Sequence, residues 1–157
     1  MLLKAWRLAT LVLSALALTM TSAHLLELPQ KMQYDAAMYS AVNTTMYRYF
    51  AIVGGVYQIG AILLAAVLVL LVRRRRPAFR WTMLGAALLL LSFVSWLMLV
   101  APVNGQVAEA LKAAPDSVPA LWMQLRGRWE YGHVTGFAIH LLGFLALVVS
   151  VLVETPD

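Results

Sequence analysis

Four long apolar stretches, separated by polar segments, dominate the pattern of hydrophobic and polar positions along the chain. Each stretch is long enough to cross the roughly 30 Å hydrocarbon core of a bilayer as a helix. We therefore expect an all-α integral membrane four-helix bundle, built by residues 1–157 as a single transmembrane domain. The expected spans cover about residues 4–28, 49–72, 80–101 and 128–153.

The two longer segments between spans are expected to lie outside the bundle and to carry short helices. The first, residues 29–48, is polar and aromatic and begins with Pro29, which should end the first span. The second, residues 102–128, should begin where Pro102 ends the third span. Its Asn104-Gly105 pair is typical of a turn, and residues 107–113 have the pattern of a short amphipathic helix.

The first apolar stretch permits a second interpretation. Its basic start and its Thr21-Ser22-Ala23 segment are also typical of a cleaved signal peptide, which would leave His24 as a new N-terminus. We expect it to be retained as a span. Its polar and small positions follow a four-three spacing that places them on one helical face, which in lipid turns toward other helices. These positions are Thr10, Ser14, Ala17, Thr21 and His24.

Composition supports a membrane setting and indicates its orientation. The chain is 62% hydrophobic and 12% charged, against about 25% charged in soluble proteins. Five arginines at 73–76 and 80 lie between two apolar stretches, where they are a topology signal rather than a nucleic-acid site. With Lys4 and Arg7 they predict a multi-pass cell-membrane protein with cytoplasmic N- and C-termini. Because cysteine is absent, disulfides and thiolate chemistry are excluded.

Two Glu/His pairs stand out against this apolar background. His24 and Glu27 end the first span, and Glu130 and His133 open the fourth, so each pair shares one helix face and both are expected at similar depth near the outer membrane edge. His140 should lie about 10 Å deeper on the same face as His133. Ionisable groups at membrane depth usually face the bundle interior and serve function.

Several roles remain open for these residues. The four side chains could bind one transition metal, iron, zinc or manganese. Without a metal, a His or Glu could act as a general base beside an oxyanion partner, for which the candidates are Arg48, Asn104, Arg126 and Arg128. A purely structural role is the third option, with Glu130 capping its helix and Glu27 pairing with Lys31. In that case His140 would only bond a serine or a backbone carbonyl.

Aromatic residues crowd the same side of the predicted bundle, among them Tyr34, Tyr39, Tyr47, Tyr49, Trp122, Trp129 and Tyr131. They are typical of an interfacial belt, or of a lining for a flat aromatic or quinone-like ligand. The expected partners are thus the lipid bilayer and a small aromatic ligand. A homo-oligomer is a further option, and no nucleic acid is expected.

Three motifs resemble the anthrone oxygenase-like family of small four-span membrane proteins: His24-Leu-Leu-Glu27-Leu-Pro29-Gln-Lys31, Pro102-Val-Asn104 and Leu125-Arg126-Gly-Arg128-Trp129-Glu130-x-x-His133. The resemblance implies oxidation of an anthrone-like substrate by oxygen. It implies site roles for His24, Glu27, Asn104, Trp129, Glu130 and His133. Gly136 stands where an arginine is frequent in that family, which implies a different substrate here.

Two functional hypotheses follow. The first is a membrane oxidoreductase of the oxygenase type, with His24, Glu27, Glu130 and His133 as catalytic or metal-binding residues. Asn104, Trp129, Arg126 and His140 would then contact the substrate. The second is a non-enzymatic membrane module that binds a metal, a quinone, a lipid or a partner helix. A transporter is disfavoured, because no span shows the broken helices typical of central transport sites.

Overall fold

The computed structural model describes residues 1–154, apart from the side chain of Arg48, and in this part of the chain it is entirely helical. Four long helices form the body: α1 (Leu2–Lys31), α3 (Arg48–Val72), α4 (Arg76–Leu99) and α6 (Val118–Leu152). The shorter helices α2 (Ala36–Thr45) and α5 (Ala101–Ala113) and the 3₁₀ turn η1 (Pro115–Ser117) connect them.

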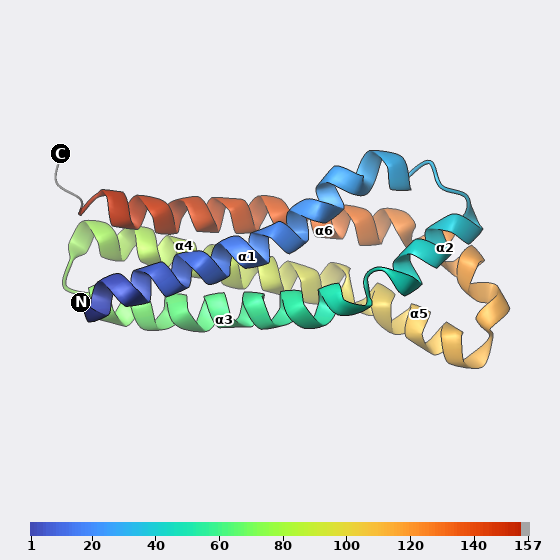
Figure 1. Ribbon diagram of the computed structural model, residues 1–157, viewed down its shortest axis with the longest axis horizontal. Helices are drawn as coiled ribbons and strands as arrows, with labels where there is room; N and C mark the ends of the chain where they lie inside the picture. Colours follow the sequence, from blue (N-terminus) through green and yellow to red (C-terminus); the bar gives the residue numbers. More distant parts are fainter. Residues whose placement is uncertain (155–157) are drawn as a thin grey trace.

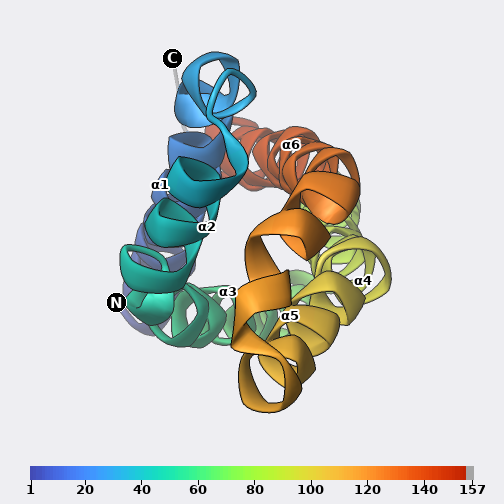
Figure 2. The ribbon, with the colours of Figure 1, turned by 90° about the vertical axis from the view of Figure 1, so that its right-hand side faces the viewer.

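Successive long helices run in opposite directions (Figure 1), and they form a ring when seen end-on (Figure 2). α1 packs against α3 and α6, and α4 packs against the same two helices on the opposite side. One end of the bundle holds both chain ends and the tight turn between α3 and α4; we call it the arginine end, after Arg7, Arg73–Arg76 and Arg80. The other, the connection end, carries α2, α5 and η1, which lie across it (Figure 2).

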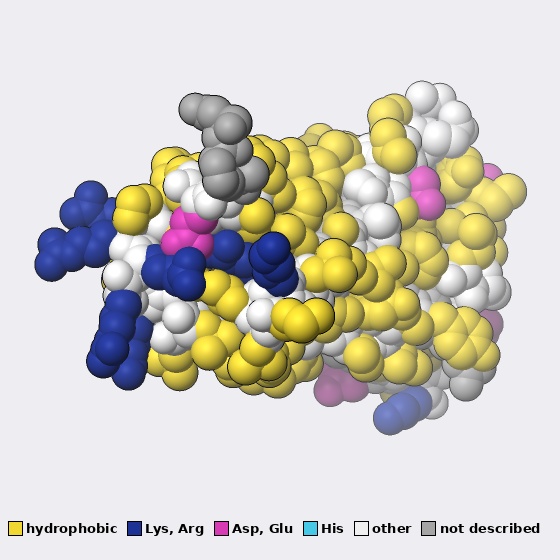
Figure 3. All heavy atoms as spheres, turned by 60° about the vertical axis from the view of Figure 1, so that its left-hand side comes forward, with side chains coloured by type: hydrophobic (Ala, Val, Ile, Leu, Met, Phe, Trp, Pro, Cys, Tyr) yellow, Lys and Arg dark blue, Asp and Glu magenta, His cyan; other side chains and the backbone are white. Residues whose placement is uncertain are grey.

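Four helices are long and apolar enough to cross a membrane, which confirms the predicted all-α class and the number of spans. Apolar side chains cover the flanks of the bundle, whereas Lys and Arg side chains gather at the arginine end (Figure 3). The short helices expected in the two connections are present as α2 and α5. The assignment of the arginine end to the cytoplasm stays a prediction.

Several predicted helix ends are wrong. Pro29 lies inside α1, two residues before its end at Lys31, because that last turn is held by tertiary contacts of Lys31. Asn104-Gly105 lies inside α5 rather than in a turn, because Pro102 occupies the first turn of that helix, where a missing N–H costs nothing. α6 begins at Val118, ten residues before the predicted start, with Pro119 likewise in its first turn.

The arginine half of the bundle is tightly packed. A Cβ at Gly143 of α6 would lie 3.2 Å from the backbone oxygen of Gly85 in α4 and 3.1 Å from the Leu88 Cβ. These two glycines let the backbones of α4 and α6 approach closely, as small residues do in membrane helix pairs. The buried hydroxyl of Thr82 donates to Ser150 Oγ at 2.9 Å in the same interface.

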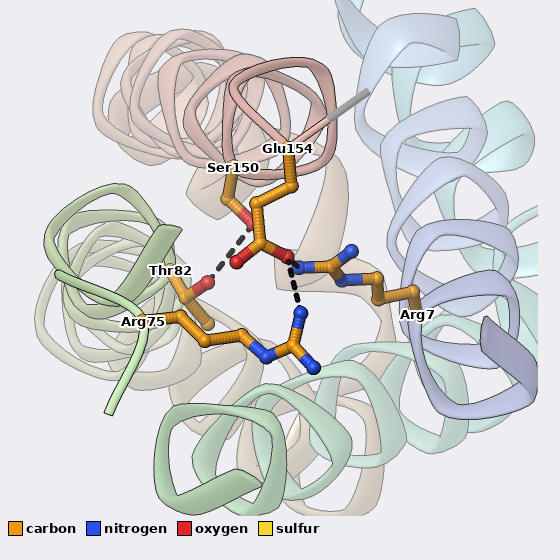
Figure 4. Close-up of polar contacts among 5 residues, drawn as sticks. All are labelled: Arg7, Arg75, Thr82, Ser150 and Glu154. Carbon is orange, nitrogen blue, oxygen red and sulfur yellow. Dashed lines mark hydrogen bonds and ion pairs between the residues drawn. The ribbon is translucent and has the colours of Figure 1, made fainter. Parts of the chain in front are cut away.

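Charged side chains close the arginine end. The Glu154 carboxylate pairs with Arg7 of α1 and, at 3.4 Å, with Arg75 in the turn before α4 (Figure 4). The Thr82–Ser150 bond lies beside this group in the same view. Three parts of the chain that are far apart in sequence are thereby joined at this end of the bundle.

We expect Gly143→Ala to lower the free energy of unfolding by about 1–3 kcal/mol, because the added methyl meets backbone atoms that cannot move aside. Denaturant titration of the detergent-solubilised protein would measure this change. Gly127→Ala in the same helix is the matched control, since its Cβ would meet nothing within 4 Å. Equal stability of the two variants would contradict the proposed close approach.

Candidate functional site

A cavity of about 330 Å³ lies inside the half of the bundle that faces the connection end. All four long helices line it, together with one residue from each of α2 and α5 and Tyr47 between α2 and α3. Its walls combine aromatic rings with small residues and a few polar groups. The lining residues used below are Asn43, Tyr47, Gly54, Gly55, Gln58, Ser92, Phe93, Trp96, Asn104, Trp122, Trp129, His24 and His133.

Two histidines from opposite sequence ends meet at the cavity wall. The rings of His24 in α1 and His133 in α6 stack with centroids 3.9 Å apart and an angle of 22° between their planes. Both side chains are buried, and both line the cavity. Protons on both rings at this separation would repel strongly, so the pair is suited to hold one added proton at most.

Trp129 holds the histidine pair in place. Its ring meets His24 edge-on at 5.0 Å and His133 at 4.4 Å, one turn of α6 away. Its indole N–H donates to Asn104 Oδ1 of α5 at 2.8 Å, which fixes the ring. Tyr47 stacks on His24 at 4.8 Å. The orientation of both imidazoles is therefore set by rigid aromatic neighbours.

A buried ion pair lies on the side of Trp129 toward the connection end. Lys31 Nζ of α1 is 2.7 Å from Glu130 Oε1 of α6, and both side chains are almost completely buried. The ammonium also lies over the rings of Trp129 at 4.4 Å and Tyr47 at 4.5 Å, in cation–π geometry. The aromatic cage and the carboxylate together replace the water that Lys31 loses.

Tyr39 of α2 completes this group, since its hydroxyl donates to Glu130 Oε1 at 2.8 Å. Burial raises the pKa of this hydroxyl, and the neighbouring Glu130 carboxylate raises it further. The phenol therefore stays protonated and keeps donating. Glu130 is thus engaged by Lys31 and Tyr39 and does not line the cavity.

Several polar atoms around the cavity have no partner among the described residues. His24 Nδ1, the Trp122 indole nitrogen and both polar atoms of the Asn43 side chain are buried and complete no hydrogen bond with that part of the chain. The Asn43 amide comes close enough to Tyr39 to influence its hydroxyl, but the contact does not meet ordinary hydrogen-bond geometry. Buried polar groups are normally paired, so unpaired ones that line one cavity point to a ligand.

The four side chains predicted to bind a metal do not form a metal-binding group in the structure. Within residues 1–154, no three His, Cys, Asp or Glu side chains are grouped closely enough to hold a metal ion. The lone pairs of stacked imidazoles lie in nearly parallel ring planes rather than converging on one point. Glu130 already binds Lys31 and Tyr39.

The remaining predicted residues lie outside the cavity. Arg126 Nη1 donates to the backbone oxygen of Tyr34, and Arg128 Nη2 to that of Met98. His140 is fully buried and contacts the hydroxyl and the backbone oxygen of Ser14 through Nε2, and its role in substrate contact stays a prediction. Glu27 is half-buried near Lys31 but forms no ion pair in the part of the chain that is described, and the side chain of Arg48 lies outside that part.

The suggested structural role of Glu130 as a helix cap is wrong, because α6 starts more than three turns before it. Sequence reasoning missed Asn43, and it paired Lys31 with Glu27 rather than with Glu130. Lys31 had a usable signal, since it lies seven residues after His24 and so on the same helix face. Asn43 had none, because nothing in the polar connection marked one residue as buried.

Comparisons with models of known protein families, with curated proteins and with solved structures found no match for the chain. The resemblance to the anthrone oxygenase-like family therefore stays a prediction, and the case for function depends on the geometry of the cavity.

The ion pair can be tested by a double-mutant cycle. Lys31→Met alone leaves a buried carboxylate unpaired and should cost about 3–5 kcal/mol of unfolding free energy, as should Glu130→Gln. The double variant should lose clearly less than the sum of the two, because neither charge is left alone. Lys112→Met, at an exposed lysine of α5, is the control and should leave stability unchanged. Additive losses would contradict a direct pair.

Proposed function

We propose that the cavity binds a flat aromatic small molecule bearing phenol or carbonyl oxygens, and that the protein is an oxidoreductase of the oxygenase type acting on it. The arginine end would face the cytoplasm, so the site would lie in the outer half of the membrane. The observation that carries the proposal is the stacked pair of His24 and His133 at the wall of an aromatic cavity, with His24 Nδ1 unpaired.

The shape and chemistry of the walls support a flat, mostly apolar ligand. Trp122, Trp129 and Trp96 offer ring faces and edges. The unpaired Trp122 N–H can donate to a ligand oxygen, and the Asn43 amide can donate or accept. Such a small number of polar groups in an otherwise apolar pocket is typical of small-molecule sites, where they fix orientation.

The histidine pair supplies a base in a site with little water. We propose that it removes a proton from the substrate, an anthrone or a related phenol. The resulting electron-rich anion passes electrons to molecular oxygen. For anthrone the overall reaction consumes one O₂ and yields anthraquinone and one H₂O, so that the ring carbon is oxidised and oxygen is reduced. No metal is required by this route, and Glu130 acts only by holding Lys31 and Trp129 in place.

A catalytic role for the histidines predicts a loss of turnover without a loss of binding. His133→Phe should lower the rate of O₂ consumption with anthrone by about 10²–10⁴-fold, the usual contribution of a positioned base. An oxygen electrode with the reconstituted protein measures the rate. Tyr131→Phe, at an exposed tyrosine two residues away, is the control. If the wild-type protein binds anthrone but never consumes O₂, the non-enzymatic binding module replaces the enzyme.

Binding itself can be tested at the unpaired amide. Asn43→Leu should weaken binding of 1,4-naphthoquinone by about 2–10-fold, because one ligand hydrogen bond is lost. Stability should not fall, since the amide completes no hydrogen bond with the described residues. Quenching of tryptophan fluorescence reports binding. Gln106→Leu, at an exposed amide of α5, is the matched control. Unchanged affinity in Asn43→Leu would remove Asn43 from the site.

A further inference from the structure

The two helices α3 and α4 are close together at the arginine end but separate toward the connection end. Near the middle of the bundle the Gln58 side chain of α3 donates to the backbone oxygen of Leu89 in α4 at 3.0 Å. Below this bond Ala61, Ala65 and Leu89 are buried together with Leu147 of α6. Because Gln58 also lines the cavity, this contact between the two helices lies at the cavity border.

One turn further toward the connection end, the described residues leave open space beside α3. Gly55 lies three residues before Gln58, on the same face of α3, and a Cβ built on it would meet no atom within 4 Å. Ala51, another turn away on that face, is exposed although it lines the cavity. Gly143, by contrast, would meet α4 backbone atoms at 3.2 Å. The cavity wall is thus incomplete between α3 and α4.

The opening lies within a part of α3 that is apolar enough to cross a membrane. Gly55 is six residues, about 9 Å, inside the span that begins at Tyr49. Its neighbours on the outer surface of α3 are the exposed Ile52 and Val56, and α4 offers the exposed Val94 and Leu97 opposite. Phe93 and Trp96 of α4 line the cavity beside the opening, with ring planes 8° apart.

We propose that the cavity opens sideways into the bilayer between α3 and α4, and that its ligand is a membrane-dissolved amphiphile whose apolar tail lies in this opening. The inference rests on the proposed ligand site and specifies its ligand class. The flat head with its oxygens contacts His24, Asn43 and Trp122, while the tail passes Gly55 into the lipid. A cavity of about 330 Å³ closed on all sides would hold the head but not a long tail.

The test compares two naphthoquinones that differ only in their tail. Menadione has no tail, and menaquinone-4 carries a polyisoprenoid chain. Both are added to the full chain in lipid nanodiscs, and the saturable part of tryptophan quenching is measured against mole fraction in the bilayer. Wild type should bind both within about threefold, because the tail stays in an apolar medium in either state.

Gly55→Phe should close the opening without disturbing the helix, because the space around Gly55 is empty. It should weaken menaquinone-4 binding at least about tenfold and change menadione binding by no more than about threefold. Val56→Phe, at the adjacent lipid-facing position, is the matched control and should bind both as wild type does.

Each other outcome overturns the inference in an identifiable way. If wild type binds menadione but excludes menaquinone-4, the cavity is a closed ligand site, and the proposed function stands without the opening. If Gly55→Phe weakens both quinones equally, Gly55 contacts the head rather than a tail. If neither quinone quenches saturably, the ligand site itself is wrong, and the inference falls with it.

Discussion

The buried ion pair between Lys31 and Glu130 is the interaction on which the candidate site depends. Removing two charges from water costs several kcal/mol per ion. This cost is offset only if the two charges lie close together and accept or donate further hydrogen bonds. The pair therefore needs α1 to continue through Pro29 to Lys31, α6 to start well before Glu130, and α2 to bring Tyr39 within hydrogen-bond distance. Those three requirements determine how the connection end is built.

Trp129 links this ion pair to the cavity. Its ring lies under the Lys31 ammonium and also contacts the rings of His24 and His133. The polar groups on the ion-pair side are largely paired, with Glu130 held by Lys31 and Tyr39. Those on the cavity side include His24 Nδ1, Asn43 and Trp122, which complete no hydrogen bond with the described residues. An ion-paired group thus supports a neighbouring group whose polar atoms are available to a ligand.

The parts of this arrangement that sequence could predict follow from periodicity and topology. Apolar runs predicted the four long helices, and counting residues along antiparallel spans correctly placed His24 and His133 at the same depth, where they now stack. The helix ends could not be predicted, because the turns at Lys31 and Val118 are fixed by tertiary contacts and not by local sequence. The glutamates were assigned to the histidines because pairs three residues apart share a helix face. Glu130 nevertheless lies almost one turn nearer the connection end than His133, and there it pairs with Lys31.

A contrast between small side chains at one end and large aromatic ones at the other explains why the cavity lies at one end of the bundle. Near the arginine end, Gly85 and Gly143 bring α4 and α6 into backbone contact, and Glu154 joins Arg7 to Arg75, so the helices have no room to separate. Toward the connection end, large rings such as Trp122 and Trp129 stand between the helices and hold them apart. A Cβ built on Gly55 would meet no described atom within 4 Å. Packing a few large aromatic residues at one end and small residues at the other is enough to build a cavity that begins at Gln58 and faces the connection end.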